Sequence, residues 1–174
     1  PRVALNRSGG NSKTGLGVRE KNLFGLGVQI EFKTVKNLDR QGQQFELSTK
    51  HLFNTRIQSS IYLENNDDGF VRAVSIGQPF YALDTRKSWG LEVSNVKEQV
   101  GFYQSGDRIR DTQRMRAAGS IFYGVSNGLK AGRSHRFIFG LSYERQDVLL
   151  AFAQNVDAGE TRTRKLVAPF VQWS

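Results

Sequence analysis

The sequence predicts an all-β fold, an antiparallel meander of about ten long strands. Three observations lead to this prediction. Apolar and polar residues alternate with period two in one segment after another, as in VQIEFK at 28–33. Clusters of Gly, Asn, Asp and Ser separate these segments, and such residues favour the turns of hairpins. No long window keeps the 3.6-residue period of a helix, so no helix is predicted.

The first half of the chain holds six of the predicted strands. Their alternation is clearest in the third, where Val28, Ile30 and Phe32 share one side. Pro79 has no N–H to donate to a ladder and therefore marks the end of the sixth. The six are expected at Val3–Arg7, Thr14–Glu20, Leu26–Lys36, Gln43–Leu52, Arg56–Asn65 and Phe70–Pro79.

Four further strands follow in the second half. Trp89, Leu91 and Val93 face one way in the first of these. Residues 115–123 and 136–144 repeat the same alternation. The four are expected at Ser88–Val100, Thr112–Tyr123, Arg136–Leu149 and Leu166–Trp173. Since turn signals join successive strands, neighbours should pair as hairpins and give an antiparallel sheet.

Alternation alone allows two opposite arrangements. In a soluble barrel the apolar side points inward, and in a membrane barrel it meets lipid while the polar side lines the lumen. Several runs reach 9 to 12 residues, whereas soluble strands average about 5–6 residues and spanning strands need about 9–11. Length therefore favours part of a transmembrane β-barrel. Aromatic residues near strand ends fit interfacial girdles, and they are Phe53, Phe80, Tyr81, Trp89, Phe102, Tyr103, Phe122, Tyr123 and Trp173.

Composition narrows the classes of partner. The formal net charge is +9, from 25 Lys and Arg against 16 Asp and Glu, which favours anionic partners such as lipid headgroups. No basic helix or aromatic RNA-binding motif is present, so nucleic acid is not predicted. No apolar run approaches the roughly 20 residues of a membrane helix. The absence of cysteine excludes disulfides and thiolate chemistry.

No motif nominates a catalytic or cofactor site. The Gly pairs at 15/17 and 25/27 do not extend to G-x-G-x-x-G, because Glu20 and Ile30 occupy the third position. The only two histidines, His51 and His135, have no ligand neighbours at metal-binding spacing. We therefore predict no catalytic residue, no metal, no cofactor and no enzymatic activity.

Four stretches together resemble one family in order and spacing. They are RSGGNSKTGLGVREKNLFGLGVQIEF, STKHLFNTR, NNDDGF and IGQPFYALDTRKSWGLEV, which cover about the first half of the chain. In this they are similar to the Omp85/TpsB superfamily of outer-membrane barrels, whose barrel is the surface-antigen (D15-like) domain. The matching motifs lie at Glu20–Gly27, Lys50–Arg56, Asp68–Gly69 and Pro79–Arg86. After Val100 the likeness is one of strand rhythm.

The resemblance implies a sixteen-stranded barrel of which residues 1–174 form strands one to ten. We therefore expect a portion of a larger chain, because the family's V/I-R-G-F/Y motif and periplasmic POTRA domains are missing from it. Short turns such as NLFG and LFNTR would face the periplasm. The family mechanism implies a weak lateral seam at the first strand, here Val3, Ala4, Leu5, Asn6 and Arg7. The polar residues expected to face the lumen are Glu31, Lys33, Glu46, Lys50, Glu64, Glu92, Arg114 and Arg116.

The implied function is the insertion or translocation of polypeptides at the outer membrane of a Gram-negative bacterium. The implied partners are outer-membrane lipid and lipopolysaccharide, client polypeptides and accessory envelope proteins. Two alternatives stay open on the sequence. One is a small complete outer-membrane barrel acting as a pore or adhesin, and the other is a soluble lipocalin-like binding barrel with an apolar interior.

Overall fold

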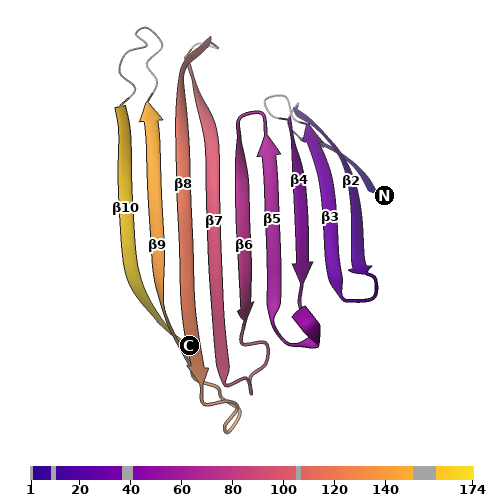
Figure 1. The fold of residues 1–174 in the computed structure, drawn as a ribbon, viewed down its shortest axis with the longest axis vertical. Helices are drawn as coiled ribbons and strands as arrows, with labels where there is room; N and C mark the ends of the chain where they lie inside the picture. Colours follow the sequence, from indigo (N-terminus) through magenta and orange to yellow (C-terminus); the bar gives the residue numbers. More distant parts are fainter. Residues whose placement is uncertain (1, 9–10, 37–40, 105–106, 151–159) are drawn as a thin grey trace.

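The chain forms one antiparallel sheet of ten strands in sequential order, which confirms the predicted all-β meander (Figure 1). This is a computed structural model, and it describes residues 2–8, 11–36, 41–104, 107–150 and 160–174. The strands are β1 (Arg2–Ser8), β2 (Asn11–Leu23), β3 (Val28–Lys36), β4 (Gln41–Thr49), β5 (Gln58–Asn66), β6 (Gly69–Gln78), β7 (Lys87–Gln104), β8 (Asp107–Ser126), β9 (Arg136–Leu150) and β10 (Glu160–Trp173).

Four connections lie together at one end of the sheet, the lower end in Figure 1: residues 24–27, 50–57, 79–86 and 127–135. In the first, Phe24, Gly25 and Gly27 take positive φ, and the Asn22 side-chain oxygen accepts the Gly27 N–H at 2.7 Å. The second contains a single 3-10 turn, η1 (Leu52–Asn54), in which Phe53 has φ 51°. Phe24 and Phe53 are each 88 % exposed.

The central hairpin is longer than predicted. The sequence suggested that β7 ends at Val100 and that β8 begins at Thr112, because Gly, Ser and Asp crowd the intervening residues. In the structure β7 has 18 residues and β8 has 20, and their pairing continues to Gln104↔Asp107 across one register shift. Ladder hydrogen bonds between the two neighbours extend the strands through residues of low strand propensity.

The sheet is a single layer that does not close on itself. Among the described residues β1 pairs only with β2, and β10 pairs only with β9. No apolar side chain of the described residues is buried, and several large ones are more than half exposed, including Val18 at 61 % and Val167 at 66 %. An apolar sheet face normally packs on another layer. Here that cover must come from outside the described residues.

Candidate functional site

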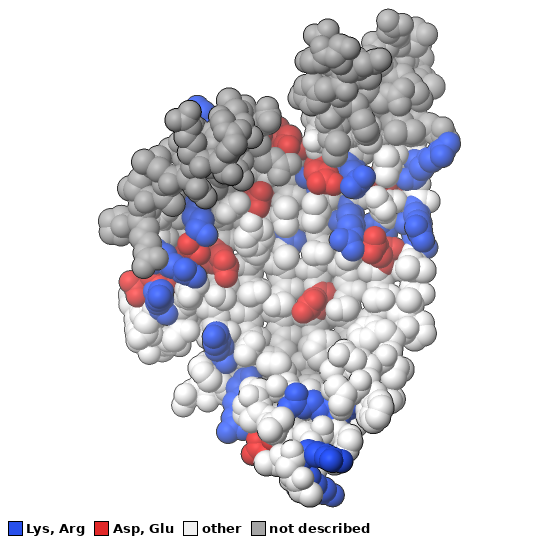
Figure 2. Space-filling view, turned by 180° about the vertical axis from the view of Figure 1, so that it is seen from behind, with Lys and Arg blue, Asp and Glu red and all other residues white. Residues whose placement is uncertain are grey.

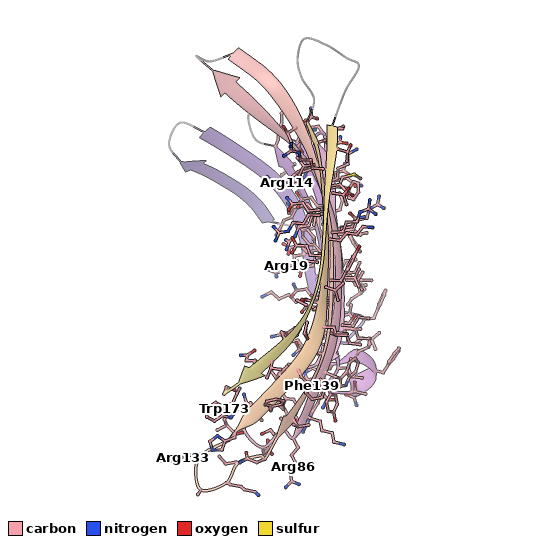
Figure 3. All side chains as sticks on the ribbon, turned by 90° about the vertical axis from the view of Figure 1, so that its left-hand side faces the viewer. Arg19, Arg86, Arg114, Arg133, Phe139 and Trp173 are labelled. Atoms are coloured by element: carbon pink, nitrogen blue, oxygen red, sulfur yellow. The ribbon has the colours of Figure 1, made fainter. Side chains whose placement is uncertain are left out.

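The sheet is curved, and its register sorts the side chains onto a concave and a convex face. Figure 3 shows the bend edge-on, with Arg19 and Arg114 on the concave side. Side chains alternate along a strand, and directly paired residues share a face. The register of neighbouring strands therefore assigns each described strand residue to one of the two faces.

The convex face carries an apolar belt. Its rows follow direct cross-strand pairs, such as Val74↔Val93 and Tyr143↔Val167. The belt consists of Val18, Val28, Ile30, Phe32, Phe45, Leu47, Ile61, Leu63, Val74, Ile76, Trp89, Leu91, Val93, Ile121, Tyr123, Val125, Phe137, Phe139, Leu141, Tyr143, Val167, Pro169, Val171 and Trp173. On β9 it covers four successive convex positions, from Phe137 to Tyr143, or about 20 Å of strand at about 3.4 Å per residue.

Aromatic rings gather at the lower margin of the belt. Trp89, Tyr123 and Phe139 form one row of direct pairs across β7, β8 and β9. The ring centroids of Tyr123 and Phe139 lie 5.9 Å apart, and those of Phe137 and Phe139 lie 6.2 Å apart. Such a band is typical of the interfacial girdle of a membrane barrel.

The belt runs obliquely across the rows. The row that contains Phe32 on β3 reaches Arg145 on β9 and Lys165 on β10, so it is apolar at one side of the sheet and cationic at the other. Between β3 and β10 the middle of the belt shifts by about three residues, or roughly 10 Å. A slab of lipid produces this pattern when strands are inclined to its normal, as they are in barrels.

The concave face holds paired charges, and Figure 2 shows Lys and Arg interspersed with Asp and Glu over it. Glu31 lies 3.0 Å from the Lys33 ammonium and 3.6 Å from Nε of Arg19. On the other half of the sheet Arg116 contacts Glu144 at 2.9 Å, and Arg114 contacts Glu98 at 3.3 Å. Arg19, Glu98 and Glu144, which pair with the polar residues predicted to face the lumen, lie on the same face of the sheet as those residues. Opposed carboxylates and cations on a water-lined surface satisfy one another without a buried core.

Glu64 is the centre of a hydrogen-bond cluster on the same face. The Tyr62 hydroxyl donates to Glu64 Oε2, the Asn66 amide donates to Oε1 at 2.6 Å, and the Gln44 amide donates to Oε2 at 3.2 Å. Three donors from two neighbouring strands fix one carboxylate, which ties β4 to β5 through side chains as well as backbone. Strand parity was the only property of Tyr62 that could be predicted from the sequence.

A row of small hydroxyl side chains crosses the middle of the concave face. Direct pairs connect Ser48, Ser60, Ser75, Glu92, Ser120 and Ser142 in order. Ser60 and Ser75 share a hydrogen bond of 2.8 Å. The row from Ser60 to Ser142, without Ser48, lines a groove of about 330 Å³ together with residues of the adjoining row. Glu92 is exposed at its centre.

Below this row, aromatic rings cover glycines. A Cβ on Gly90 would lie 2.4 Å from the Phe122 ring, and one on Gly140 would lie 2.6 Å from the Phe170 ring. Phe80, from the connection at 79–86, lies over Gly124 in the same manner. Nη2 of Arg136 donates to the Ala82 carbonyl at 3.1 Å, and its guanidinium lies 5.1 Å from the Phe80 ring. The connection therefore folds against the concave face of β8 and β9.

This packing corrects part of the predicted aromatic girdle. Phe80 and Phe122 lie on the concave face over glycines, so they do not belong to the convex margin. The prediction failed for them because nearness to a strand end says nothing about the face. Phe102 and Tyr103 have side chains outside the described ones.

The structure places seven of the eight predicted polar residues on one face. Glu31, Lys33, Glu46, Glu64, Glu92, Arg114 and Arg116 all have concave parity. Lys50 lies after the end of β4, in the connection to β5, and joins neither face. Val3 to Arg7 lie within β1 and pair with residues 12–16 of β2. Their side chains are outside the described ones.

The described residues were also compared with what a metal site or a membrane-spanning helix requires. No group of three or more metal-ligating residues occurs in the part of the chain that the structure describes. In those same residues no helix has the length and apolar character to cross a membrane. No family model, curated protein or solved structure matches this chain.

Proposed function

We propose that this chain forms part of the outer-membrane β-barrel of an Omp85-like protein that inserts or translocates polypeptides. The observation that carries the proposal is the division of the sheet into an apolar convex face and an ionic concave face. The likeness of the turn motifs to that family supports the choice of family. The predicted chemistry is backbone templating, without a catalytic residue.

The direction of curvature supports a membrane barrel. Continuing the observed bend encloses the concave face, which carries pairs such as Arg116–Glu144, and leaves the belt outside. Lipid would then cover the exposed apolar side chains, and the backbone groups of β2 to β9 are paired with strands on both sides. A lipocalin-like barrel requires the opposite bend, with the apolar face enclosed.

The shared location of three resembling motifs also supports the proposal. NLFGLG forms the connection at 24–27, LFNTR the connection at 50–57, and PFYALDTR the connection at 79–86. All three lie at the lower end of the sheet. At the first edge, β1 pairs only with β2 among the described residues, so its other side could accept a client strand. The concave charges would then line a water-filled bore.

The test uses introduced cysteines, because residues 1–174 contain none and each labelled thiol in this part is therefore an introduced one. Four variants of the full-length protein, each with one introduced cysteine, are made in a Gram-negative host. Val93→Cys and Leu141→Cys test the convex face, and their sequence neighbours Ser94→Cys and Ser142→Cys test the concave face. We expect a water-soluble, membrane-impermeant maleimide to label the Ser-derived cysteines about tenfold faster than the convex ones, because lipid covers the latter.

The four variants are also labelled after denaturation, where all should react alike. Equal labelling of both members of each pair in the membrane would contradict the spanning arrangement. Faster labelling of the convex members would indicate a soluble barrel with the opposite face enclosed.

A further inference from the structure

We propose that the connection at 79–86, named here the inner strap, is a two-position gate at the lower mouth of the lumen. The strap lies at the lower end of the sheet in Figure 1. In the closed position, seen in the structure, it lies on the concave face. In the lifted position it swings away from that face and widens the mouth. The inference rests on the proposed membrane barrel and adds a means of regulating its bore.

The inner strap reaches further across the sheet than its two ends require. It joins β6 to β7, which are neighbours. Its Phe80 ring nevertheless lies over Gly124 of β8. Its Ala82 carbonyl accepts a hydrogen bond of 3.1 Å from Nη2 of Arg136, which lies on β9. Strands stand about 4.8 Å apart, so β9 lies roughly 10 Å beyond β7. Since the concave face encloses the lumen in the proposed barrel, the strap extends across the lower mouth.

Two contacts hold the first half of the strap on the concave face. The Phe80 ring occupies the space above Gly124, where a Cβ would lie 2.9 Å from it. The Arg136 guanidinium lies 5.1 Å from the same ring and also bonds the Ala82 carbonyl. A guanidinium close to an aromatic ring is attracted to it. Closure therefore depends on residues 80–82.

The second half of the strap is anchored to the sheet. The Arg86 carbonyl accepts the Ser126 N–H at 2.8 Å, which extends the β7–β8 ladder by one hydrogen bond. The Thr85 N–H donates to the Ala82 carbonyl at 3.2 Å, and the Ala82 N–H donates to Thr85 Oγ1 at 3.2 Å. Because the turn is bonded within itself, it can lift as a unit about an end that stays in the ladder.

Two buried polar atoms oppose closure. Ser88 is 1 % exposed, and its Oγ has no hydrogen-bond partner among the described residues. A Cβ on Gly124 would clash with this oxygen as well as with the Phe80 ring, so the two meet over the same glycine. Nε of Arg136 is also buried without a partner in the described part of the chain. A buried, unpaired polar atom loses the hydrogen bonds that it makes with water. Lifting the strap returns both atoms to water.

This balance identifies the strap as a gate and not as a fixed wall. A wall that stays closed is more stable with an apolar side chain or a bonded pair at position 88, whereas a hydroxyl suits a surface that water reaches part of the time. Both positions therefore have free energies close enough for small changes to shift their populations.

The experiment measures the position of the strap by double electron–electron resonance. It uses the full-length protein, with any cysteine outside residues 1–174 replaced, in lipid nanodiscs. One spin label is attached at Leu83→Cys on the strap, where the native side chain is 55 % exposed. The other is attached at Ser142→Cys on the concave face of β9, about 20 Å along the strand from Arg136. We expect two distances, a major one for the closed position and a minor one for the lifted position.

Three variants shift this balance in known directions. Ser88→Ala removes the unpaired hydroxyl and should lower the lifted fraction about fivefold. Gly124→Ala places a methyl where the Phe80 ring and the Ser88 hydroxyl lie, so the lifted position should become the major one. Phe80→Ala removes the ring that holds the strap and should also raise the lifted fraction, without adding a clash.

Matched controls lie away from the strap. Ser120→Ala removes a hydroxyl in the middle of the concave face, and Gly119→Ala adds a methyl that meets nothing closer than 3.4 Å. Neither should change the lifted fraction. The conductance of the same proteins in planar lipid bilayers should rise with the lifted fraction, being highest for Phe80→Ala and Gly124→Ala and lowest for Ser88→Ala.

Several outcomes would overturn the gate. They are a single distance that Gly124→Ala and Phe80→Ala leave unchanged, a lifted fraction that does not fall in Ser88→Ala, and a conductance that does not follow the lifted fraction. If any of these occurs while the convex cysteines stay protected in the membrane, the inference fails and the spanning function stands. Rapid labelling of the convex cysteines contradicts the spanning function, whatever the strap does.

Discussion

At the scale of single residues, the packing of the lower concave face depends on glycines, which leave room for aromatic rings. Gly90 and Gly140 each face an aromatic ring on the neighbouring strand, and the ring occupies the space where a Cβ would stand. Ser88, beside this packing, is only 1 % exposed. The glycines thus allow rings to lie against the sheet, and they give this part of the face close packing although the described residues bury no apolar side chain.

Gly90→Ala should destabilise the folded protein by about 1–3 kcal/mol, the range for overpacking a close contact. The new methyl would lie 2.4 Å from a carbon of the Phe122 ring, which would have to move. Urea unfolding of the full-length protein from lipid vesicles measures the change. Gly119→Ala is the matched control, because its Cβ would meet nothing closer than 3.4 Å. Equal stability of the two variants would refute the packing account.

At the scale of elements, the oblique belt gives a depth prediction that differs from the row order. Phe32 on β3 lies one row above Val167 on β10. On β3 the belt extends from Val28 to Phe32, so Phe32 lies one convex position above its middle, whereas Val167 lies one and a half convex positions above the middle of the belt on β10 and adjoins Lys165.

Spin labels at Phe32→Cys and Val167→Cys should therefore report the label on β3 as the deeper one. The measurement is the ratio of oxygen to nickel-chelate accessibility in lipid vesicles. A deeper label at the β10 position would mean that rows run parallel to the membrane, and the inclination of the strands would then be wrong.

The proposed polypeptide insertion depends on the edge strand β1, which would form one side of the lateral seam. A disulfide between Val3→Cys and a cysteine on the strand that closes the full-length barrel should abolish polypeptide insertion, because the seam could no longer open to a client strand. Activity is measured before and after reduction. Recovery on reduction distinguishes a blocked seam from misfolding, and full activity of the crosslinked protein would exclude a seam at β1.

Much of the element scale could be predicted from the sequence. Alternation located all ten strands, because a period of two survives wherever one face differs in polarity from the other. It also grouped Glu31, Glu46 and Arg116 correctly by parity. It could not predict which face is convex, since curvature arises from twist and pairing across the whole sheet. The extension of β7 and the contacts of Tyr62 likewise depend on neighbours distant in sequence.

At the scale of the whole molecule, the sheet is a single curved layer with two open edges. The described residues bury no large apolar side chain, so the ladder and the concave polar network hold the strands together. Hydrophobic stabilisation must then come from a medium that covers the belt. This accounts for the coexistence of a low mean hydropathy of −0.48 with a continuous apolar surface.

The unequal lengths of the strands have one more consequence. β7 continues from Asn95 to Gln104 beyond the top of the belt, which amounts to roughly 30 Å of extended chain, and β8 accompanies it. In the proposed barrel this two-stranded hairpin would project beyond the membrane at the cell surface. Antibodies and bacteriophages approaching the cell would meet it before any other described part of the protein, so its tip is the place where immune pressure should drive sequence variation.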